Sequence, residues 1–171
     1  MICENIAKKF QLDVRPEIAY MVGLMHDTGK MLLCQIDPEG YGEAIAAVQE
    51  EGKSLIQAEH ELFGCDNCLA GYIFAKNGNL PHILQMSIAH QHDLDDLDDD
   101  SKNMVSILAI ADHLCHKESI GSDGDRADAR IQTLSAHPAW KILRPSLPPS
   151  FSITKFASEL NKEISVIKEE L

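Results

Sequence analysis

Residues 23–30 read GLMHDTGK and lie in the most apolar segment of the chain. Between residues 18 and 33 the pattern is apolar except at His26, Asp27, Thr28 and Lys30. A helix that is apolar all round is buried in a protein core. We therefore expect one buried helix here, with its polar side chains satisfied by a metal ion, an ion pair or hydrogen bonds, because an unpaired buried charge is costly.

Helical periodicity also dominates the rest of the chain. Ile2, Ile6 and Phe10 recur every four residues, which predicts a short helix with one apolar face. Further helices are predicted to begin near residue 16 and to span about 38–51, 55–63, 67–77, 81–92, 102–117, 127–134, 137–143 and 153–171. Capping residues support these starts, namely Asp37, Ser54, Asp66, Ser101 and Ser152. With no alternating strand pattern of useful length, the sequence predicts an all-α orthogonal helical bundle.

Composition limits the function classes. A chain of 171 residues can bury a sizeable core, and we expect a single domain over residues 1–171. Its net charge of −12 argues against binding to nucleic acid or to an anionic membrane surface. No apolar run reaches the ~20 residues that span a bilayer, and residues 1–13 lack a signal-peptide core. Five irregularly spaced cysteines are typical of free thiols in a reducing compartment, so we expect a cytoplasmic protein.

A second polar residue in an apolar helix strengthens the case for a metal site. Asp112 lies in SILAIADHLCH, residues 106–116, and shares a helix face with His116, whereas His113 points elsewhere. Together with His26 and Asp27 it would supply mixed nitrogen and oxygen ligands. Such a set suits a divalent metal such as Mn²⁺, Fe²⁺, Mg²⁺, Zn²⁺ or Ni²⁺. The alternative is that these residues hydrogen-bond to one another and hold neighbouring helices together.

Other histidines and cysteines give weaker signals. His90 and His92 are two residues apart, so both can face one ion only if the helix has already ended. His60 has acidic neighbours and is expected at the surface. Cys65 and Cys68 form a single C-x-x-C without the second ligand pair of a zinc knuckle or the βαβ setting of a redox site, so we expect small packed residues.

Three segments together resemble a known family. AYMVGLMHDTGKMLL, residues 19–33, resembles the signature helix of the HD superfamily of metal-dependent phosphohydrolases, and more narrowly the HDOD group of HD-related output domains in bacterial signalling proteins. Residues 58–92, AEHELFGCDNCLAGYIFAKNGNLPHILQMSIAHQH, resemble that group's acidic-Leu-Phe-Gly-x-Asp-His helix pair, its Leu-Pro helix start and its closing His-His. ILAIADHLCH, residues 107–116, resembles the Ala-Asp-x-Leu helix. The resemblance implies an HD-like core over residues 1–117, followed by C-terminal helices over 118–171.

The resemblance also implies a ligand set. His26 and Asp27 match the central His-Asp pair, and Asp112 matches the distant aspartate. The leading histidine of the family would fall at or before Met1. Two further family histidines are replaced, by Asn67 after Asp66 and by Gln91 in the closing pair, where His92 aligns with the other member.

These departures favour regulation over catalysis. We expect an HDOD-type signal-transduction domain that binds signalling proteins, has no cofactor and does not catalyse a reaction. The alternative is a metal-dependent phosphohydrolase acting on a nucleotide or cyclic dinucleotide, with Lys30 near the phosphate and His92 as a possible further ligand. A third reading keeps the pocket for a nucleotide without turnover. If upstream helices are missing, Ile2, Ile6 and Phe10 would be uncovered, and a homodimer could cover them.

Overall fold

The computed structural model describes residues 1–10, 13–95, 97–118, 120 and 133–170. These residues form α-helices and short 3₁₀ helices and no strand, which confirms the all-α prediction. None of the described helices is long and apolar enough to cross a membrane. The elements are α1 (Ile2–Phe10), α2 (Pro16–Met25), α3 (Thr28–Ile36), α4 (Pro38–Glu51), α5 (Leu55–Phe63), α6 (Asn67–Asn77), α7 (His82–Ala89), α8 (Lys102–Lys117), η1 (Leu134–Ala136), α9 (Pro138–Leu143), η2 (Arg144–Ser146) and α10 (Ile153–Glu170).

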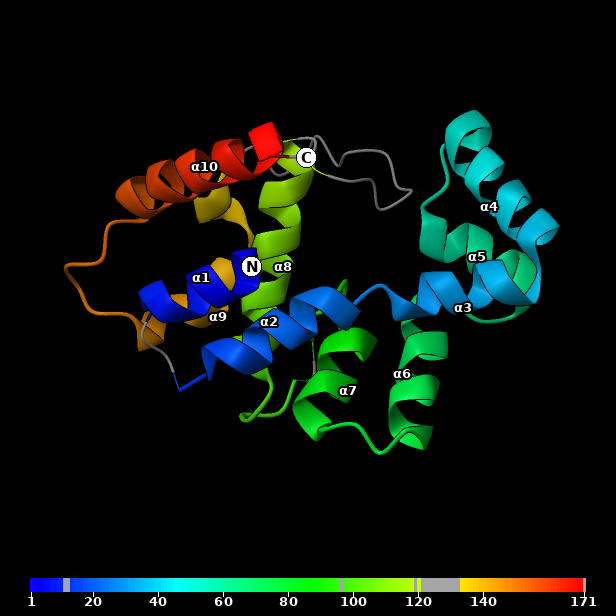
Figure 1. Cartoon of the computed structure of the whole chain (residues 1–171), viewed down its shortest axis with the longest axis horizontal. Helices are drawn as coiled ribbons and strands as arrows, with labels where there is room; N and C mark the ends of the chain where they lie inside the picture. The colour runs from blue at the N-terminus through cyan, green and yellow to red at the C-terminus, as the bar shows by residue number, and fades with distance from the viewer. Residues whose placement is uncertain (11–12, 96, 119, 121–132, 171) are drawn as a thin grey trace.

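The helices cross at steep angles, as expected of an orthogonal bundle. Figure 1 shows α8 running nearly upright across α1 and α2, with α9 and α10 gathered around the same helix. From the end of α2 the chain turns into α3, which leads away from this group to α4 and α5. The hairpin of α6 and α7 lies beneath α2 and α3 in the same view, so the α2–α3 junction stands where the two parts of the bundle meet.

The main core forms around α8, in which residues 104–111 are all buried. The apolar face of α1 contributes to this core, since Ile6 is 0% and Phe10 is 3% exposed. The Phe10 ring lies 4.6 Å from that of Phe156 and 6.3 Å from that of Trp140, measured between ring centroids. The expectation of an uncovered α1 face is therefore wrong: the C-terminal helices of the same chain cover it.

Most predicted helix boundaries are confirmed by their caps. The side chain of Asp37 accepts a hydrogen bond from the backbone of Gly40, and that of Asp66 accepts one from Leu69. Ser54 forms a reciprocal capping box at the start of α5. Local side-chain chemistry thus sets these ends, as the sequence indicates.

The single helix predicted over residues 18–33 is wrong, because it breaks at the His26–Asp27 pair. α2 ends at Met25, Asp27 adopts φ −92° and ψ 11°, and α3 begins at Thr28. The hydroxyl of Thr28 donates to the carbonyl of Met25 at 2.7 Å and stabilises the turn. Full burial of this segment is also contradicted, since Leu24 is 71% exposed.

Smaller differences occur near the later helices. α7 ends at Ala89, which is three residues earlier than predicted, and leaves residues 90–92 outside the helix. Ser101 does not cap α8 through its side chain, because its hydroxyl donates instead to Asp98 at 2.7 Å. The predicted helix at 127–134 lies largely outside the described residues. The predicted helix at 137–143 is confirmed as α9.

Candidate functional site

The turn between α2 and α3 brings three predicted residues together. His26 is the first residue after α2, and its Nδ1 lies 3.0 Å from the carbonyl oxygen of Gly23. Its Nε2 lies 3.3 Å from Oδ2 of Asp27 and 3.9 Å from Oδ1 of Asp112, which comes from the middle of α8. Residues that are 85 positions apart in the sequence therefore meet around one imidazole ring.

Lys30 completes this cluster from the first turn of α3. Its Nζ lies 2.9 Å from Oδ1 of Asp27, and the lysine side chain is only 14% exposed. Asp27 is thus held between the imidazole of His26 on one oxygen and the ammonium of Lys30 on the other. In this arrangement the charge of Lys30 is directed at Asp27 within its own turn.

His92 does not join the ion pairs of this cluster. It is exposed in the segment after α7, while His90 before it is half-buried. His60 is exposed on α5, as expected. His113 points away from Asp112 and lies against His137, with ring centroids 5.1 Å apart, so its predicted direction is confirmed.

The donor set at His26 fits a divalent ion in kind. A nitrogen 3.0 Å from a carbonyl oxygen must donate, so Nδ1 carries a proton and Nε2 faces the two carboxylates. Metal-bound histidines commonly anchor their second nitrogen in this way. An ion pair of a protonated ring with Asp27 and Asp112 satisfies the same geometry. Among the residues that the structure describes, no group of three or more His, Cys, Asp or Glu side chains is arranged as a metal centre.

A buried hydrogen-bond network lies where the resemblance expects two further histidines. Both the backbone nitrogen and the side-chain Nδ2 of Asn67 donate to Oε2 of Glu59, at 2.8 and 2.7 Å. Nε2 of Gln91 donates to Oδ1 of Asn67 at 3.1 Å. All three residues are buried: Glu59 is 0% exposed, Asn67 is 1% exposed and Gln91 is 6% exposed. The network therefore ties the start of α6 to α5 and to the segment after α7.

Glu59 is the centre of this network, and the pKa of its carboxyl group lies above its ordinary value. Burial raises the pKa of its carboxyl group, while the hydrogen bonds from Asn67 and the nearby charge of Lys30 act in the opposite direction. The hydroxyl of Tyr41 also interacts with the carboxylate. The pKa of that phenol is raised, mainly by burial and to a smaller extent by the negative charge of Glu59. Neither Glu59 nor Tyr41 is among the site residues that the sequence predicts. One signal was available: Glu59 stands four residues after Leu55, on the apolar face of α5.

Gly29 explains why the motif contains a glycine before its lysine. A Cβ atom at this position would lie 1.8 Å from the carbonyl oxygen of Asn67 and 2.9 Å from the backbone nitrogen of Gly71. α3 and α6 therefore touch backbone to backbone, directly beside the Asn67 network. The glycine serves close helix packing here.

The cysteine pair is packed, as the sequence predicts. Cys65 is half-buried and Cys68 is buried. Burial raises the pKa of the Cys68 thiol to about 12, and Nε2 of Gln91 lies 3.4 Å from its sulfur. A thiol with this pKa is not a nucleophile at neutral pH.

The family model described as HDOD domain matches residues 1–94. None of the curated proteins matches the sequence significantly.

Two solved structures are similar over nearly the whole chain. An HDOD domain protein of unknown function from Geobacter sulfurreducens has a TM-score of 0.81 and 27% identity, over 98% of this chain and 57% of that one. A proposed phosphohydrolase from Shewanella amazonensis SB2B has a TM-score of 0.68 and 24% identity, over 94% of this chain and 55% of that one, and shows the fold alone. This chain thus spans little more than half the length of either protein. The family match over more than half of its residues shows that the chain belongs to the HDOD domain family.

Proposed function

We propose that this chain is a regulatory HDOD domain that acts in bacterial signal transduction through contacts with signalling proteins rather than by catalysis. The Glu59–Asn67–Gln91 network carries this proposal. At the two positions where the family resemblance calls for further histidines, the chain has amides that are bound to each other and to a buried carboxylate.

The amides of Asn67 and Gln91 are poorly suited to hold a metal ion. Imidazole is a strong ligand for divalent transition metals, whereas an amide offers only a weak carbonyl oxygen. Oδ1 of Asn67 already accepts a hydrogen bond from Gln91, and its amide nitrogen is committed to Glu59. Recruiting these groups to an ion would leave a buried carboxylate without its donors, which is costly. The network therefore favours a structural use of this half of the site.

Exposed apolar side chains support a role in protein contacts. Leu24, at the end of α2, and Met31 and Ile36, on α3, are 71%, 73% and 76% exposed. Large apolar groups of this exposure are commonly covered by a partner. A signalling protein or a second copy of the chain would cover them. Light scattering that finds only monomer at high micromolar concentration would exclude the homodimer. Unpaired thiols at all five cysteines support a location in the cytoplasm.

A second candidate, a metal-dependent phosphohydrolase acting on a nucleotide or cyclic dinucleotide, is favoured by one observation. His26, Asp27 and Asp112 converge, and the carbonyl of Gly23 orients the imidazole. These three residues would hold a divalent ion, which would supply an activated water and polarise a phosphate. In that case Lys30, which is paired with Asp27 at 2.9 Å, would assist a phosphate.

One experiment separates the two functions. The protein is purified without chelator and incubated with Mn²⁺ or Ni²⁺, and bound metal is measured by elemental analysis. Turnover is then tested with bis(p-nitrophenyl) phosphate and a cyclic dinucleotide. The regulatory proposal expects no turnover above that of a reaction without protein. His60→Ala, a variant of an exposed histidine on α5, is the control that should keep any turnover that depends on the His26 cluster. Stoichiometric metal with turnover that His26→Ala abolishes would establish the hydrolase instead.

A further inference from the structure

We propose that the hollow between α9 and the segment leading to α10 binds an acidic peptide segment of a partner protein, with one apolar side chain at its centre. The inference rests on the proposed regulatory function, because it names the chemistry of the partner that such a domain would contact. The residues involved follow residue 94, where the family match ends.

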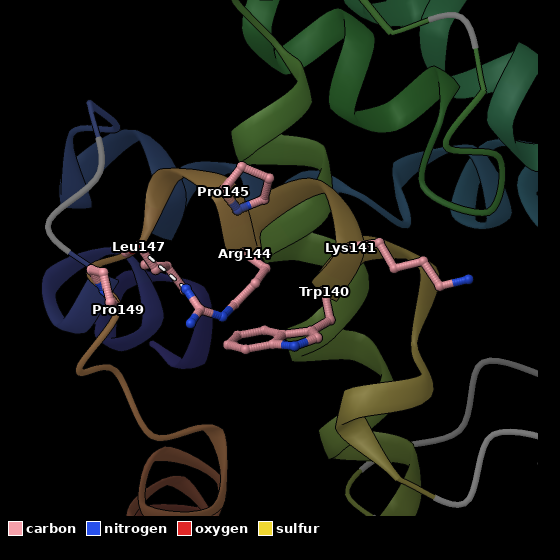
Figure 2. Close-up of a pocket in the computed structure, with 6 residues that line it drawn as sticks. All are labelled: Trp140, Lys141, Arg144, Pro145, Leu147 and Pro149. Carbon is pink, nitrogen blue, oxygen red and sulfur yellow. Dashed lines mark hydrogen bonds between the residues drawn. The ribbon is translucent and has the colours of Figure 1, made fainter.

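The hollow has an apolar floor and an open top. Its volume is about 600 Å³, and its lining residues are Trp140, Lys141, Arg144, Pro145, Leu147 and Pro149 (Figure 2). Trp140 and Leu147 are 8% and 5% exposed and form the floor, whereas both prolines are exposed at the rim. A depression of this shape suits one apolar side chain that projects from a peptide, in the manner of a buried anchor at a protein interface.

The charges of the rim favour an acidic partner. Two of the described lining residues are cationic and none is acidic, in a chain whose net charge is −12. Nη1 of Arg144 donates to the carbonyl of Leu147 at 3.3 Å, and among the described residues the guanidinium has no carboxylate partner. Its remaining N–H donors match the geometry of a carboxylate. Figure 2 shows Lys141 extending away from Trp140 and Arg144, so the two cations can bind acidic residues on either side of the anchor.

The floor is rigid before any ligand arrives. The Trp140 ring lies 6.3 Å from that of Phe10 and 5.9 Å from that of Phe151, which fixes it in an aromatic cluster. Pro145 and Pro149 restrict the backbone on the opposite side. Because these groups are already ordered, little conformational entropy is lost when a segment binds.

Trp140 is the single tryptophan of the chain and reports directly on this hollow. The test is a titration of the full chain with a short tryptophan-free peptide that has two glutamates on each side of a leucine, followed by tryptophan emission. We expect a saturable change in emission. Replacing either cation by glutamate, as Arg144→Glu or Lys141→Glu, should weaken binding about tenfold, the value of one hydrogen bond to a charged group. Lys162→Glu, the same charge change at an exposed position on α10, should leave binding unchanged.

Several results would overturn the proposal. One is the absence of a saturable change in tryptophan emission, and another is equal affinity for a peptide with lysines in place of the glutamates. The proposal would also fail if Lys162→Glu weakened binding as much as Arg144→Glu or Lys141→Glu, or if free glutamate or a mononucleotide bound more tightly than the peptide. The assay involves neither metal nor turnover. Its failure would therefore leave the regulatory function standing, and phosphodiesterase activity would overturn that function without bearing on this hollow.

Discussion

The substitution Gly29→Ala should strongly destabilise the chain, although alanine is the better helix former. The new methyl group would stand 1.8 Å from the carbonyl oxygen of Asn67, which is backbone and cannot rotate away. Ordinary contact requires α3 and α6 to separate by about 1.5 Å. Overpacking of this kind costs about 1–3 kcal/mol or more, against about 1 kcal/mol gained from helix propensity. Because separation would also pull Asn67 from Glu59, we expect a net loss of at least about 2 kcal/mol.

Urea unfolding followed by far-ultraviolet circular dichroism measures this loss. With a slope of about 2 kcal/mol per molar urea, the midpoint should fall by about 1 M. Gly42→Ala is the matched control, because Gly42 also lies inside a helix but a Cβ there meets no atom within 4 Å. That variant should gain about 0.5–1 kcal/mol. If both variants are stabilised alike, the reasoning about contact between α3 and α6 is wrong.

Three further predictions concern other parts of the fold. Burial, with a smaller effect of His113, lowers the pKa of His137 from 6.5 to about 4. The folded state therefore favours the neutral imidazole, and the stability that this residue contributes is complete above pH 6.5 and is lost as the pH falls toward 4. This loss reaches at most about 3 kcal/mol. In His137→Asn, which keeps a cap for the backbone nitrogen of Ala139, the urea midpoint should depend less on pH over this range. An equally steep dependence on pH would show that His137 is not the group responsible. Glu59→Gln should change the unfolding free energy at pH 8 by less than about 1 kcal/mol. Glu59→Leu should cost about 2–4 kcal/mol, because two buried donors of Asn67 lose their acceptor. Equal losses of the two variants in calorimetry would refute the role of Glu59 as the acceptor for Asn67. Phe10→Ala should cost about 3–5 kcal/mol in urea unfolding, because its ring lies within the aromatic cluster that joins α1 to α10, and a loss below about 1 kcal/mol would mean that the cluster does not hold these helices.

Helix ends were predictable where one side chain determines them. Asp37, Ser54 and Asp66 each cap a helix through a contact three residues away, so a short stretch of sequence contains the cause. The break at His26–Asp27 was not predictable in the same way. Its surroundings are apolar and continue the helical pattern. The hydroxyl of Thr28 stabilises the turn locally, and the packing of α3 against α6 and of His26 against α8 adds contacts that the sequence pattern does not contain. Here tertiary contacts override a local preference.

In the candidate site, too, one part was predictable from the sequence and another was not. Polarity in an apolar segment pointed to His26, Asp27 and Asp112, and the structure brings them together. The network around Glu59 could not be found by this reasoning, because it depends on which polar groups are neighbours in space. Glu59 and Gln91 are separated by 32 positions and come together only through Asn67.

The position of Asn67 links these observations. Its carbonyl oxygen contacts Gly29, its two nitrogens bind Glu59, and its side-chain oxygen accepts from Gln91. One residue therefore joins α3, α5, α6 and the segment after α7. A metal-bound histidine would join the same elements through an ion, whose occupancy depends on supply and pH. Hydrogen bonds hold the junction without an ion, and a domain needs this if it presents the same surface to a partner whatever the metal supply.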